Sequence, residues 1–238
     1  MRRLLTASTL VLGLSLSFGL TPLLAHAEAV PTVVNITKPV LGTTILVVMP
    51  EVTLGLLTAS GSTDPKEEWS QNGRKYINAG LNSALAVRKY NLASVDLSTY
   101  EDPRALQILK LNDTVSDSIA FNAFPGLALP TKTSFDWTLG DGATSLVPAG
   151  STTPPAYALF VRVKGTYSSG GRAAMMIGMA ALGVGMPMGG QVITGSLVDL
   201  KTGQIVWYET MGVPPGTDIR TPEGAGEAVN ILFKKLPL

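Results

Sequence analysis

The sequence has no cysteine and only one histidine, His26, among its 238 residues. Without a thiol the chain can form no disulfide, and it has no acceptor for the lipid that bacterial lipoproteins carry on an N-terminal cysteine. Because His26 lies in a segment that we expect to be removed, Ser-His-Asp triads, Cys-His pairs and the usual structural zinc sites are excluded from the mature protein. Its stability must come from packing alone. We expect no cofactor and no enzymatic activity.

Charged residues are also few. They make up 15% of the chain, and the formal net charge is +1. A nearly neutral chain offers no electrostatic footprint for nucleic acid or for an acidic membrane surface, so we expect no nucleic-acid partner. The length that remains after an N-terminal signal, roughly 210 residues, is enough for one domain to bury a core without disulfides.

The N-terminal segment has the three parts of a secretory signal peptide. Two arginines stand at the start, residues 4–20 are apolar, and small residues surround His26. This order predicts a signal peptide over residues 1–27, with cleavage after Ala27 or after Ala29. We therefore expect a periplasmic protein that is exported and is not a lipoprotein.

Runs of β-branched and aromatic residues predict the strands. The clearest pattern is in the third strand, where Leu159 and Val161 alternate with Phe160 and Arg162. A short glycine-containing turn joins the last two strands into a β-hairpin. The predicted strands are Thr43–Pro50, Leu92–Leu97, Ala156–Tyr167, Gln191–Leu200 and Gln204–Met211. The run Thr53–Thr63, rich in glycine, serine and threonine, predicts a loop.

A capping residue followed by proline marks the start of each long helix. The predicted helices begin at Asp64-Pro65, Asp102-Pro103 and Thr221-Pro222. In the first, Glu67 stands at the capping-box position. Gly73 and Gly80 lie inside the same helix and each lower its propensity by about 1 kcal/mol relative to alanine, which indicates a close backbone approach there.

The order of these elements is typical of an α/β protein: strand, helix, strand, helix, strand, insertion, hairpin, helix. We expect a single-domain layered fold with a mixed sheet of about five strands and helices packed on it. A C-terminal β-hairpin plus helix and an apolar helical insertion at residues 170–190 complete this prediction. The domain should span residues 43–238 and follow an extended segment at residues 28–42.

The hairpin and its flanks resemble a family of envelope proteins. The pattern is a strand, a hairpin of the form x-L-V-D-x-x-T-G-x-x-h-W and a C-terminal helix. It is met here by Ala156–Ala158, Leu197–Leu200, Thr202-Gly203 and Val206-Trp207. With "ILVVMP" as the opening strand and "DIRTPEGAGEAVNILFKKLP" as the closing helix, the chain resembles the α/β proteins related to the curli secretion channel subunit and the penicillin-binding-protein activator lipoproteins, as a distant, non-lipidated member.

This resemblance implies a non-enzymatic periplasmic scaffold or assembly factor, with no catalytic residues to carry over. Two departures limit what it implies. The family members are mostly lipoproteins, whereas this chain has no cysteine for the lipid. An apolar insertion also stands where the channel subunits carry membrane hairpins, so channel formation does not carry over.

The insertion at residues 170–190 reads GGRAAMMIGMAALGVGMPMGG. Its apolar part, Ala173–Met186, would be about 21 Å long as a helix, shorter than the roughly 30 Å hydrocarbon core of a bilayer. It also lacks the alternation of a membrane β-hairpin. Small residues four apart and a ridge of methionine and leucine predict a helix that binds an apolar surface. The predicted interaction residues are Ala174, Met175, Gly178, Met179, Ala181, Leu182, Gly185 and Met186.

Three partners remain open for this helix: the chain's own domain, another copy or a different envelope protein, and the membrane surface. The leading expectation is a non-catalytic, outer-membrane-associated periplasmic protein that acts by protein contact. An alternative is a small-ligand or anion-binding module at Gly170, Gly171 and Arg172, because a turn between strand and helix offers amides and a guanidinium. The plainer interpretation of that turn is a flexible loop with a solvated arginine.

A carboxylate-dependent hydrolase is a more distant alternative. The best candidates for the paired carboxylates of a glycoside hydrolase are Asp136 and Asp141. Asp136 directly precedes Trp137, and Asp141 follows it four residues later. Their separation of five residues says nothing about the distance between the two carboxyl groups. A role in a turn and at a helix start is the plainer interpretation.

Overall fold

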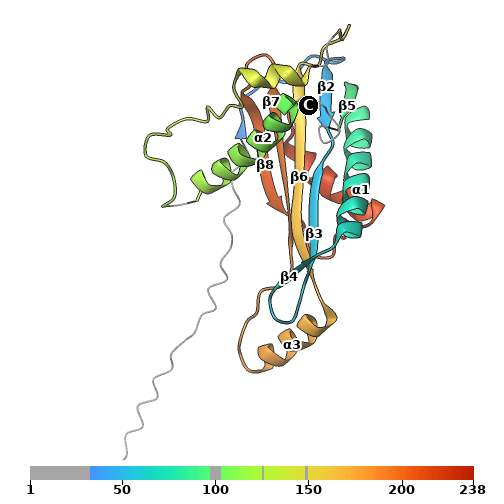
Figure 1. The fold of residues 1–238 in the computed structure, drawn as a ribbon, viewed down its shortest axis with the longest axis vertical. Helices are drawn as coiled ribbons and strands as arrows, with labels where there is room; N and C mark the ends of the chain where they lie inside the picture. Colours follow the sequence, from blue (N-terminus) through green and yellow to red (C-terminus); the bar gives the residue numbers. More distant parts are fainter. Residues whose placement is uncertain (1–32, 97–102, 125, 148–149) are drawn as a thin grey trace, which may run out of the picture.

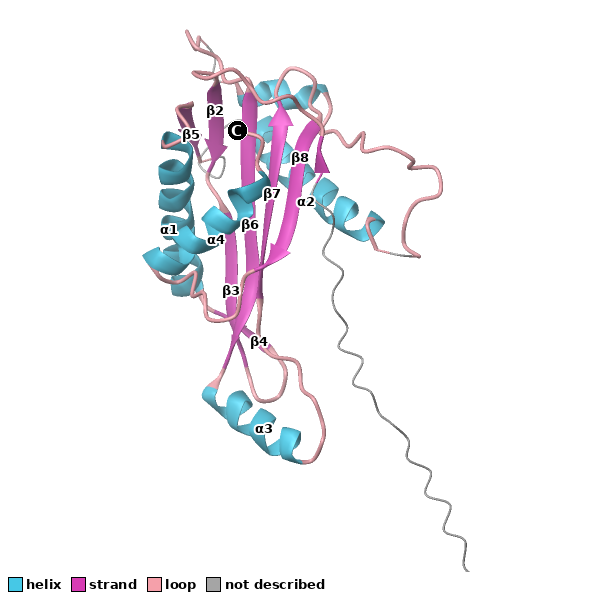
Figure 2. Ribbon diagram, turned by 180° about the vertical axis from the view of Figure 1, so that it is seen from behind, coloured by secondary structure: helices cyan, strands magenta, loops and turns pink. Residues whose placement is uncertain are grey.

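The computed structural model describes residues 33–96, 103–124, 126–147 and 150–238 (Figures 1 and 2). The signal peptide predicted for residues 1–27, with its two alternative cleavage sites, lies outside the described residues. Most of the segment expected to be extended, from residue 33 to residue 42, is described, and it begins with a two-residue strand.

A mixed sheet forms the centre of the molecule. Its strands are β1 (Val33–Val34), β2 (Thr44–Val48), β3 (Glu51–Leu57), β4 (Thr63–Pro65), β5 (Asn91–Val95), β6 (Tyr157–Ser168), β7 (Gln191–Asp199) and β8 (Ile205–Gly212). The main path runs β1-β8-β7-β6-β2-β5, and β3 pairs with β6 and β4. The α/β fold class is confirmed. The described part of the chain holds eight strands rather than about five, because short edge strands and β3 add to the predicted set.

The strand β6 has a different partner on one edge along each half of its length. It pairs in parallel with β2 at Tyr157–Leu159 and with β3 at Arg162–Ser168. Pro50 lies between β2 and β3. Proline cannot donate a hydrogen bond to a sheet ladder, so Pro50 separates β2 from β3. The chain remains extended on both sides of it.

The loop predicted for residues 53–63 is therefore wrong. Residues 53–57 belong to β3, the tight turn that follows spans residues 58–62, and β4 returns from residue 63. Gly55 is required in this hairpin because a Cβ atom there would lie 2.5 Å from Cγ2 of Thr63. Its presence reflects close packing between β3 and β4, a contact that glycine content alone does not distinguish from a loop.

Helices cover both faces of the sheet (Figure 2). They are α1 (Glu67–Ala86), α2 (Pro103–Asn122), α3 (Gly170–Ala181) and α4 (Pro222–Leu232), with short 3-10 helices η2 (Asp141–Leu146) and η3 (Phe233–Lys235). On one face α1 and α4 share a buried cluster with β6 through Leu159 and Val161. On the other face α2 and η2 pack with Ala158 and Phe160. The alternation predicted for β6 is confirmed.

Two predicted helix starts have different outcomes. Thr221 caps α4 as expected, because its hydroxyl accepts a hydrogen bond from Gly224 N at 3.2 Å, and Pro222 is the first helical residue. The start predicted at Asp64-Pro65 is wrong. Those residues lie in β4, α1 begins at Glu67, and its N-cap makes no side-chain hydrogen bond. Asp64 instead pairs with Lys66 at 2.5 Å, since pairing with β3 holds the aspartate in an extended conformation.

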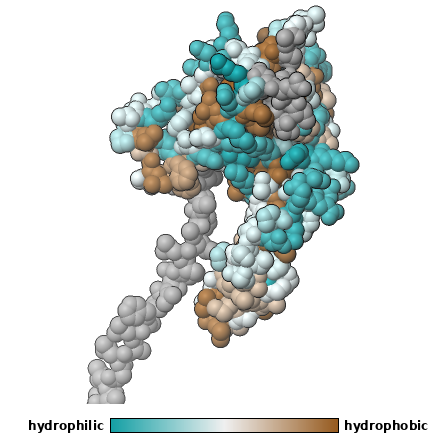
Figure 3. Space-filling model, viewed as in Figure 1, coloured by the Kyte–Doolittle hydropathy of each residue, from teal (hydrophilic) through white to brown (hydrophobic). Residues whose placement is uncertain are grey.

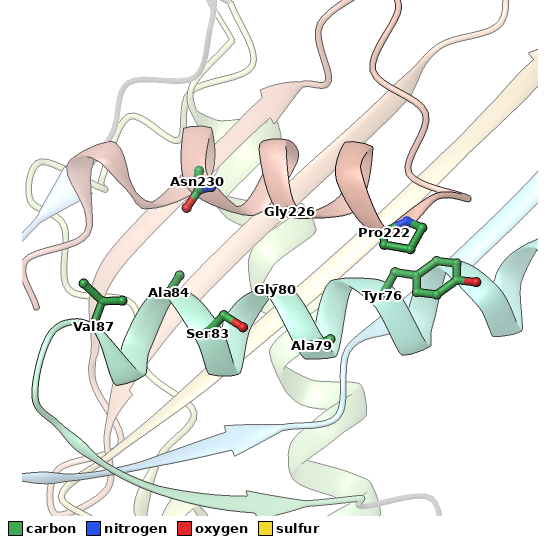
Figure 4. A pocket seen from close by; sticks show the side chains of 9 residues that line it. All are labelled: Tyr76, Ala79, Gly80, Ser83, Ala84, Val87, Pro222, Gly226 and Asn230. Atoms are coloured by element: carbon green, nitrogen blue, oxygen red, sulfur yellow. The ribbon is translucent and has the colours of Figure 1, made fainter.

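The glycines of α1 lie where the helix closely approaches its neighbours, as predicted. A Cβ atom on Gly73 would lie 2.9 Å from Val52 Cγ1 in the sheet. One on Gly80 would lie 3.5 Å from Gly226 Cα of α4. Figure 4 shows Gly80 and Gly226 on facing turns of the two helices. The absence of side chains at these two positions lets α1 and α4 pack side by side on the sheet.

The apolar insertion connects β6 directly to β7, which pair antiparallel from Tyr157 and Asp199 out to Gly165 and Gln191. It therefore forms the tip of a long hairpin, and α3 lies beyond the ends of the strands at one end of the long axis (Figure 1). The predicted helix is confirmed, but it is shorter than expected. It ends at Ala181, after which Gly183 adopts φ +77°, so Gly185 and Met186 lie on the returning segment.

Candidate functional site

The hairpin tip, residues 170–190, is an extended exposed apolar feature of the described chain. From residue 173 to residue 190 no side chain is polar or charged. Its large apolar side chains are exposed to water, with 75% of Ile177, 75% of Leu182 and 73% of Met188 accessible. In Figure 3 this end of the molecule is white, tan and brown, whereas the neighbouring end of α1 is teal. Exposed apolar surface of this kind makes the tip the candidate functional site.

One buried arginine holds the tip in place. Arg172 is 4% exposed. Its Nε and Nη2 donate to Pro187 O at 3.2 and 2.7 Å, and its Nη1 donates to Thr58 O at 3.3 Å. These bonds join the first turn of α3 to the returning segment and to the β3–β4 turn. The guanidinium thus closes the hairpin tip into a loop of defined shape.

Hydroxyl groups surround this arginine at the base of the tip. Ser169 caps α3 by accepting from Arg172 N at 3.1 Å, and Ser168 Oγ accepts from Gly189 N at 3.1 Å. In the adjacent β3–β4 turn, the hydroxyls of Thr58, Ser60 and Ser62 lie 2.8 to 2.9 Å from one another. The apolar tip is therefore joined to the body of the protein by a narrow polar collar.

The predicted interaction residues divide into two groups in the structure. Most are exposed: Ala174, Met175, Gly178, Ala181, Leu182 and Gly185. Met179 and Met186 are half-buried. Sequence reasoning missed Ile177, Val184 and Met188, which are also exposed, because they do not fall on the predicted helical ridge. The complete lack of polar residues after Arg172 was the signal that could have indicated them.

The predicted anion turn stays a prediction. Gly170 and Gly171 are exposed, but the guanidinium of Arg172 is buried and bonded to main-chain carbonyl oxygens. An anion at this turn would have to displace those carbonyls or bind to the amides without help from the guanidinium. The geometry gives Arg172 a structural role that its sequence context did not indicate.

A second polar cluster lies beside the base of the tip. The guanidinium of Arg220 forms two hydrogen bonds with the carboxylate of Asp218, at 2.9 and 2.7 Å. Its carbon Cζ lies 3.8 Å from the ring centre of Tyr167 and 4.6 Å from that of Trp69. Arg220, helped by hydrogen bonds from its own main chain and from Tyr167, lowers the pKa of Asp218 to about 2. Burial and the hydrogen bond to Asp218 raise the pKa of Tyr167. The cluster is a stable stacked ion pair.

Charged side chains also gather where α2 meets the sheet. Arg162 pairs with Asp113 at 3.2 Å and with Asp117, and Lys110 pairs with Glu51 at 3.0 Å. Burial and the negative charge of Glu51 raise the pKa of Asp113. Burial acts to raise the pKa of Glu51 too, but hydrogen bonds from Lys110 and Asp113 lower it overall. Asp113 and Asp117, four apart on one helix, were the sequence signal for this network. Each carboxylate has a cationic partner, which favours a structural role.

Asp136 and Asp141, the predicted carboxylate pair, have different surroundings from those of a general acid. Asp136 pairs with Lys132 at 2.5 Å, and this hydrogen bond lowers the pKa of Asp136. Asp141 begins η2. A general acid needs a raised pKa to hold its proton at neutral pH. The geometry at Asp136 is therefore that of a surface ion pair.

A shallow groove runs between α1 and α4 (Figure 4). Its volume is about 370 Å³. The lining residues are Tyr76, Ala79, Gly80, Ser83, Ala84, Val87, Pro222, Gly226 and Asn230. The groove offers two hydroxyls and one amide but no charged group, so it lacks the chemistry of a catalytic site.

The described residues contain no group of three histidine, cysteine, aspartate or glutamate side chains placed to bind a metal ion. Within the same described ranges, none of the helices combines the length and hydropathy needed to cross a membrane.

No family model and no curated protein matches this chain. Solved structures similar to it include a neuraminyllactose-binding hemagglutinin homolog from Helicobacter pylori, at 10% identity over 85% of this chain and 86% of that one, with a TM-score of 0.41. A PelC dodecamer from Paraburkholderia phytofirmans is 11% identical over 87% and 96% of the two chains, with a TM-score of 0.35. The LpoB C-terminal domain from Salmonella enterica is 15% identical over 74% and 87%, with a TM-score of 0.27. These distant likenesses concern the type of fold, and with TM-scores below 0.5 they carry no conclusion about activity or partners.

Proposed function

We propose that this chain is an exported, non-catalytic protein of the cell envelope that binds another envelope component through its hairpin tip. The single observation that carries the proposal is the exposure of an ordered apolar helix at the end of a long hairpin. Water contact with Ile177, Leu182 and Met188 is unfavourable, and burying each such side chain contributes about 1 to 2 kcal/mol to binding. A chain that keeps this surface exposed gains binding energy when a partner covers it.

The construction of the tip supports the same proposal. Arg172 and Ser169 give the tip internal hydrogen bonds, and α3 lies beyond the ends of the strands (Figure 1). A surface that is already ordered loses less conformational entropy when it binds. The tip therefore combines exposed apolar surface with a fixed shape, two properties that favour binding.

The periplasmic location and the place within the family of envelope scaffold proteins belong to this proposal. They are supported by the three-part N-terminal signal and by the hairpin pattern that ends in Val206-Trp207. The non-catalytic role is supported by the absence of thiols, by the position of the only imidazole at His26, and by the pairing of the carboxylates in the α2 network with cations.

Photo-crosslinking in cells that produce the protein tests the proposal. A photoreactive amino acid is placed at Ile177 in the tip or, as a matched control, at Val87, which is 83% exposed at the end of α1. We expect crosslinked adducts with an envelope component from position 177 and none from position 87. Equal labelling at the two positions, or no adduct at position 177, would contradict the proposed function.

A further inference from the structure

We infer that the component bound by the hairpin tip is a lipid bilayer, with α3 inserted below the headgroups of one leaflet. The inference rests on the proposed function and deepens it by naming the partner. It follows from the distribution of apolar and polar groups around the tip and along the hairpin.

The tip is apolar on every side. Met175 and Ile177 are two positions apart and so lie about 200° apart around the helix axis, yet both are exposed. Leu182, Val184 and Met188, which follow the helix or lie on the returning segment, are exposed as well. A protein groove that received one face of α3 would leave the opposite apolar face in water. Lipid hydrocarbon covers all sides at once, and no side chain from residue 173 to residue 190 carries a charge or polar group that would oppose it.

The dimensions of the tip match one leaflet rather than a whole bilayer. The 12 residues of α3 make a helix about 18 Å long, and in both ribbon views its axis runs obliquely across the end of the hairpin (Figures 1 and 2). A helix with its side chains is about 10 to 12 Å across, which is less than the roughly 15 Å of hydrocarbon in one leaflet. The helix is thus oriented to enter such a layer sideways, with the sheet standing away from the membrane.

The two ends of α3 have internal hydrogen-bond partners. Ser169 caps the N-terminus of α3, and Val184 N donates to Met179 O at 3.0 Å at its C-terminus. Gly183 N donates to Ala180 O, also at 3.0 Å. Hydrocarbon cannot supply hydrogen bonds, so helix ends that enter it need internal partners of this kind.

Polarity increases along the hairpin away from the tip. The one cation of the tip, Arg172, points back into the collar, where carbonyls of Thr58 and Pro187 accept its hydrogen bonds. The hydroxyls of the β3–β4 turn come next, and beyond them Asp64 of β4 pairs with Lys66, the N-cap residue of α1. From the tip toward the body, the hairpin thus carries first apolar groups, then hydroxyls and then charged groups. The same order of polarity is met on leaving a bilayer, from the hydrocarbon through the interface to water.

Vesicle binding of the mature protein tests this inference. The probe is a vesicle of zwitterionic phosphatidylcholine, because the tip offers no charge for anionic lipid. We expect the protein to float with these vesicles, and we expect a rise in NaCl from about 0.1 to about 1 M not to release it, since apolar contacts are not screened. Binding that requires anionic lipid, or that is lost in high salt, overturns the inference.

Paired variants separate the tip from general effects of charge. Ile177→Glu with Leu182→Glu should lower partitioning on the order of a hundredfold, because each loss of a buried large apolar side chain is worth about tenfold. Val40→Glu with Val87→Glu adds the same charge at two exposed apolar positions of the body and should leave partitioning unchanged. An equal loss in both double variants overturns the inference. Urea-unfolding midpoints confirm that every variant is folded.

The absence of cysteine allows a direct measure of insertion. A single Leu182→Cys variant, labelled with the dye NBD, should show a blue-shifted and brighter emission when vesicles are added, whereas Val87→Cys should not. An unchanged spectrum at position 182 overturns the inference. If vesicles do not bind but position 177 still crosslinks to an envelope protein, the lipid inference fails and the proposed function stands. If neither is observed, both fail.

Discussion

The helices α3 and α4 are nearly equal in length and both follow a strand or turn late in the chain, yet one is exposed and the other is buried. In α4, the residues facing the sheet are apolar while Glu223, Glu227 and Asn230 face water. In α3 after Arg172 no polar residue is available for a water-facing side. The comparison shows that the division of polar from apolar positions, more than apolar content, directs a helix onto its own sheet.

The two helices also differ in how the chain reaches them. Between β8 and α4 the chain can turn back over the sheet, and α4 lies beside α1 there (Figure 2). By contrast, α3 begins at Gly170, just after β6 ends at Ser168, and β6 extends away from the core. A helix that starts at the end of a long hairpin has no adjacent sheet face to cover. Topology and composition together therefore leave α3 exposed.

A charge introduced into α4 should destabilise the protein far more than a charge introduced into α3. Val229 is fully buried in the core cluster that α4 shares with α1 and the sheet. We expect Val229→Asp to lower the free energy of unfolding by about 4 kcal/mol or more, because it buries an unpaired carboxylate. Urea unfolding followed by circular dichroism measures this. The neighbouring exposed residue provides the control, since Asn230→Asp should change stability by less than about 0.5 kcal/mol. Similar losses in both variants would contradict the burial of this face.

The hydrogen bonds by which Arg172 holds the tip can be removed without unfolding the body. Arg172→Ala leaves the carbonyls of Pro187 and Thr58 without their donors, a local cost of about 2 kcal/mol. We expect amide hydrogen exchange in α3 to accelerate about 30-fold while exchange in α1 and α4 stays constant. Arg172→Lys keeps the charge but cannot donate to both carbonyls from a planar group, so it should have an intermediate effect. Unchanged exchange in α3 would show that the arginine does not hold it.

The ion pair beside the tip base should make the body sensitive to acid. The pKa of Asp218 is lowered to about 2, from an ordinary value of 3.8. A lowered pKa stabilises the folded state above about pH 4, and the contribution is lost as the pH falls through about 2. Because the Asp218 side chain is 35% exposed, we expect about 1 kcal/mol rather than the full value. Melting temperatures of wild type and Asp218→Asn should differ at pH 5 and converge near pH 2. A constant difference would contradict this assignment.

The smallest effect on stability is expected at the tip itself. Ile177 and Leu182 are mostly exposed, so Ile177→Glu with Leu182→Glu should change the free energy of unfolding by less than about 0.5 kcal/mol. Urea unfolding of this double variant beside Val229→Asp gives the comparison directly. A loss of more than about 1 kcal/mol would mean that α3 packs on the body in solution.

Much of the body was predictable from local patterns. The alternation of Leu159, Phe160 and Val161 predicted the strand β6 and the division of its side chains between two faces, and Thr221-Pro222 predicted the start of α4. These signals are local because one strand or one cap carries them. In contrast, β3 was missed because its place depends on pairing with β6, more than a hundred residues later. Its glycine and threonine content, taken alone, indicated a loop.

The nature of the tip was only partly predictable. The composition of residues 170–190 predicted a helix and an apolar partner, but a helix buried in its own domain has the same sequence pattern. Exposure follows from the pairing of β6 with β7 on both sides of the insertion, which sequence order alone did not reveal. The role of Arg172 depends on Pro187, 15 residues later, so the turn around it could not be distinguished from a solvated loop.

The continuous course of β6 has a mechanical consequence. Its 12 residues run without interruption from the core to the collar, with β7 along one edge and β2 and β3 along the other. A pull on α3 along the strand axis would load β6 and β7 together, so the hydrogen-bond rows that join this pair to β2 and β3 on one side and to β8 on the other would be loaded in shear. Many of these hydrogen bonds would have to break at once, so the hairpin should resist extension along its long axis.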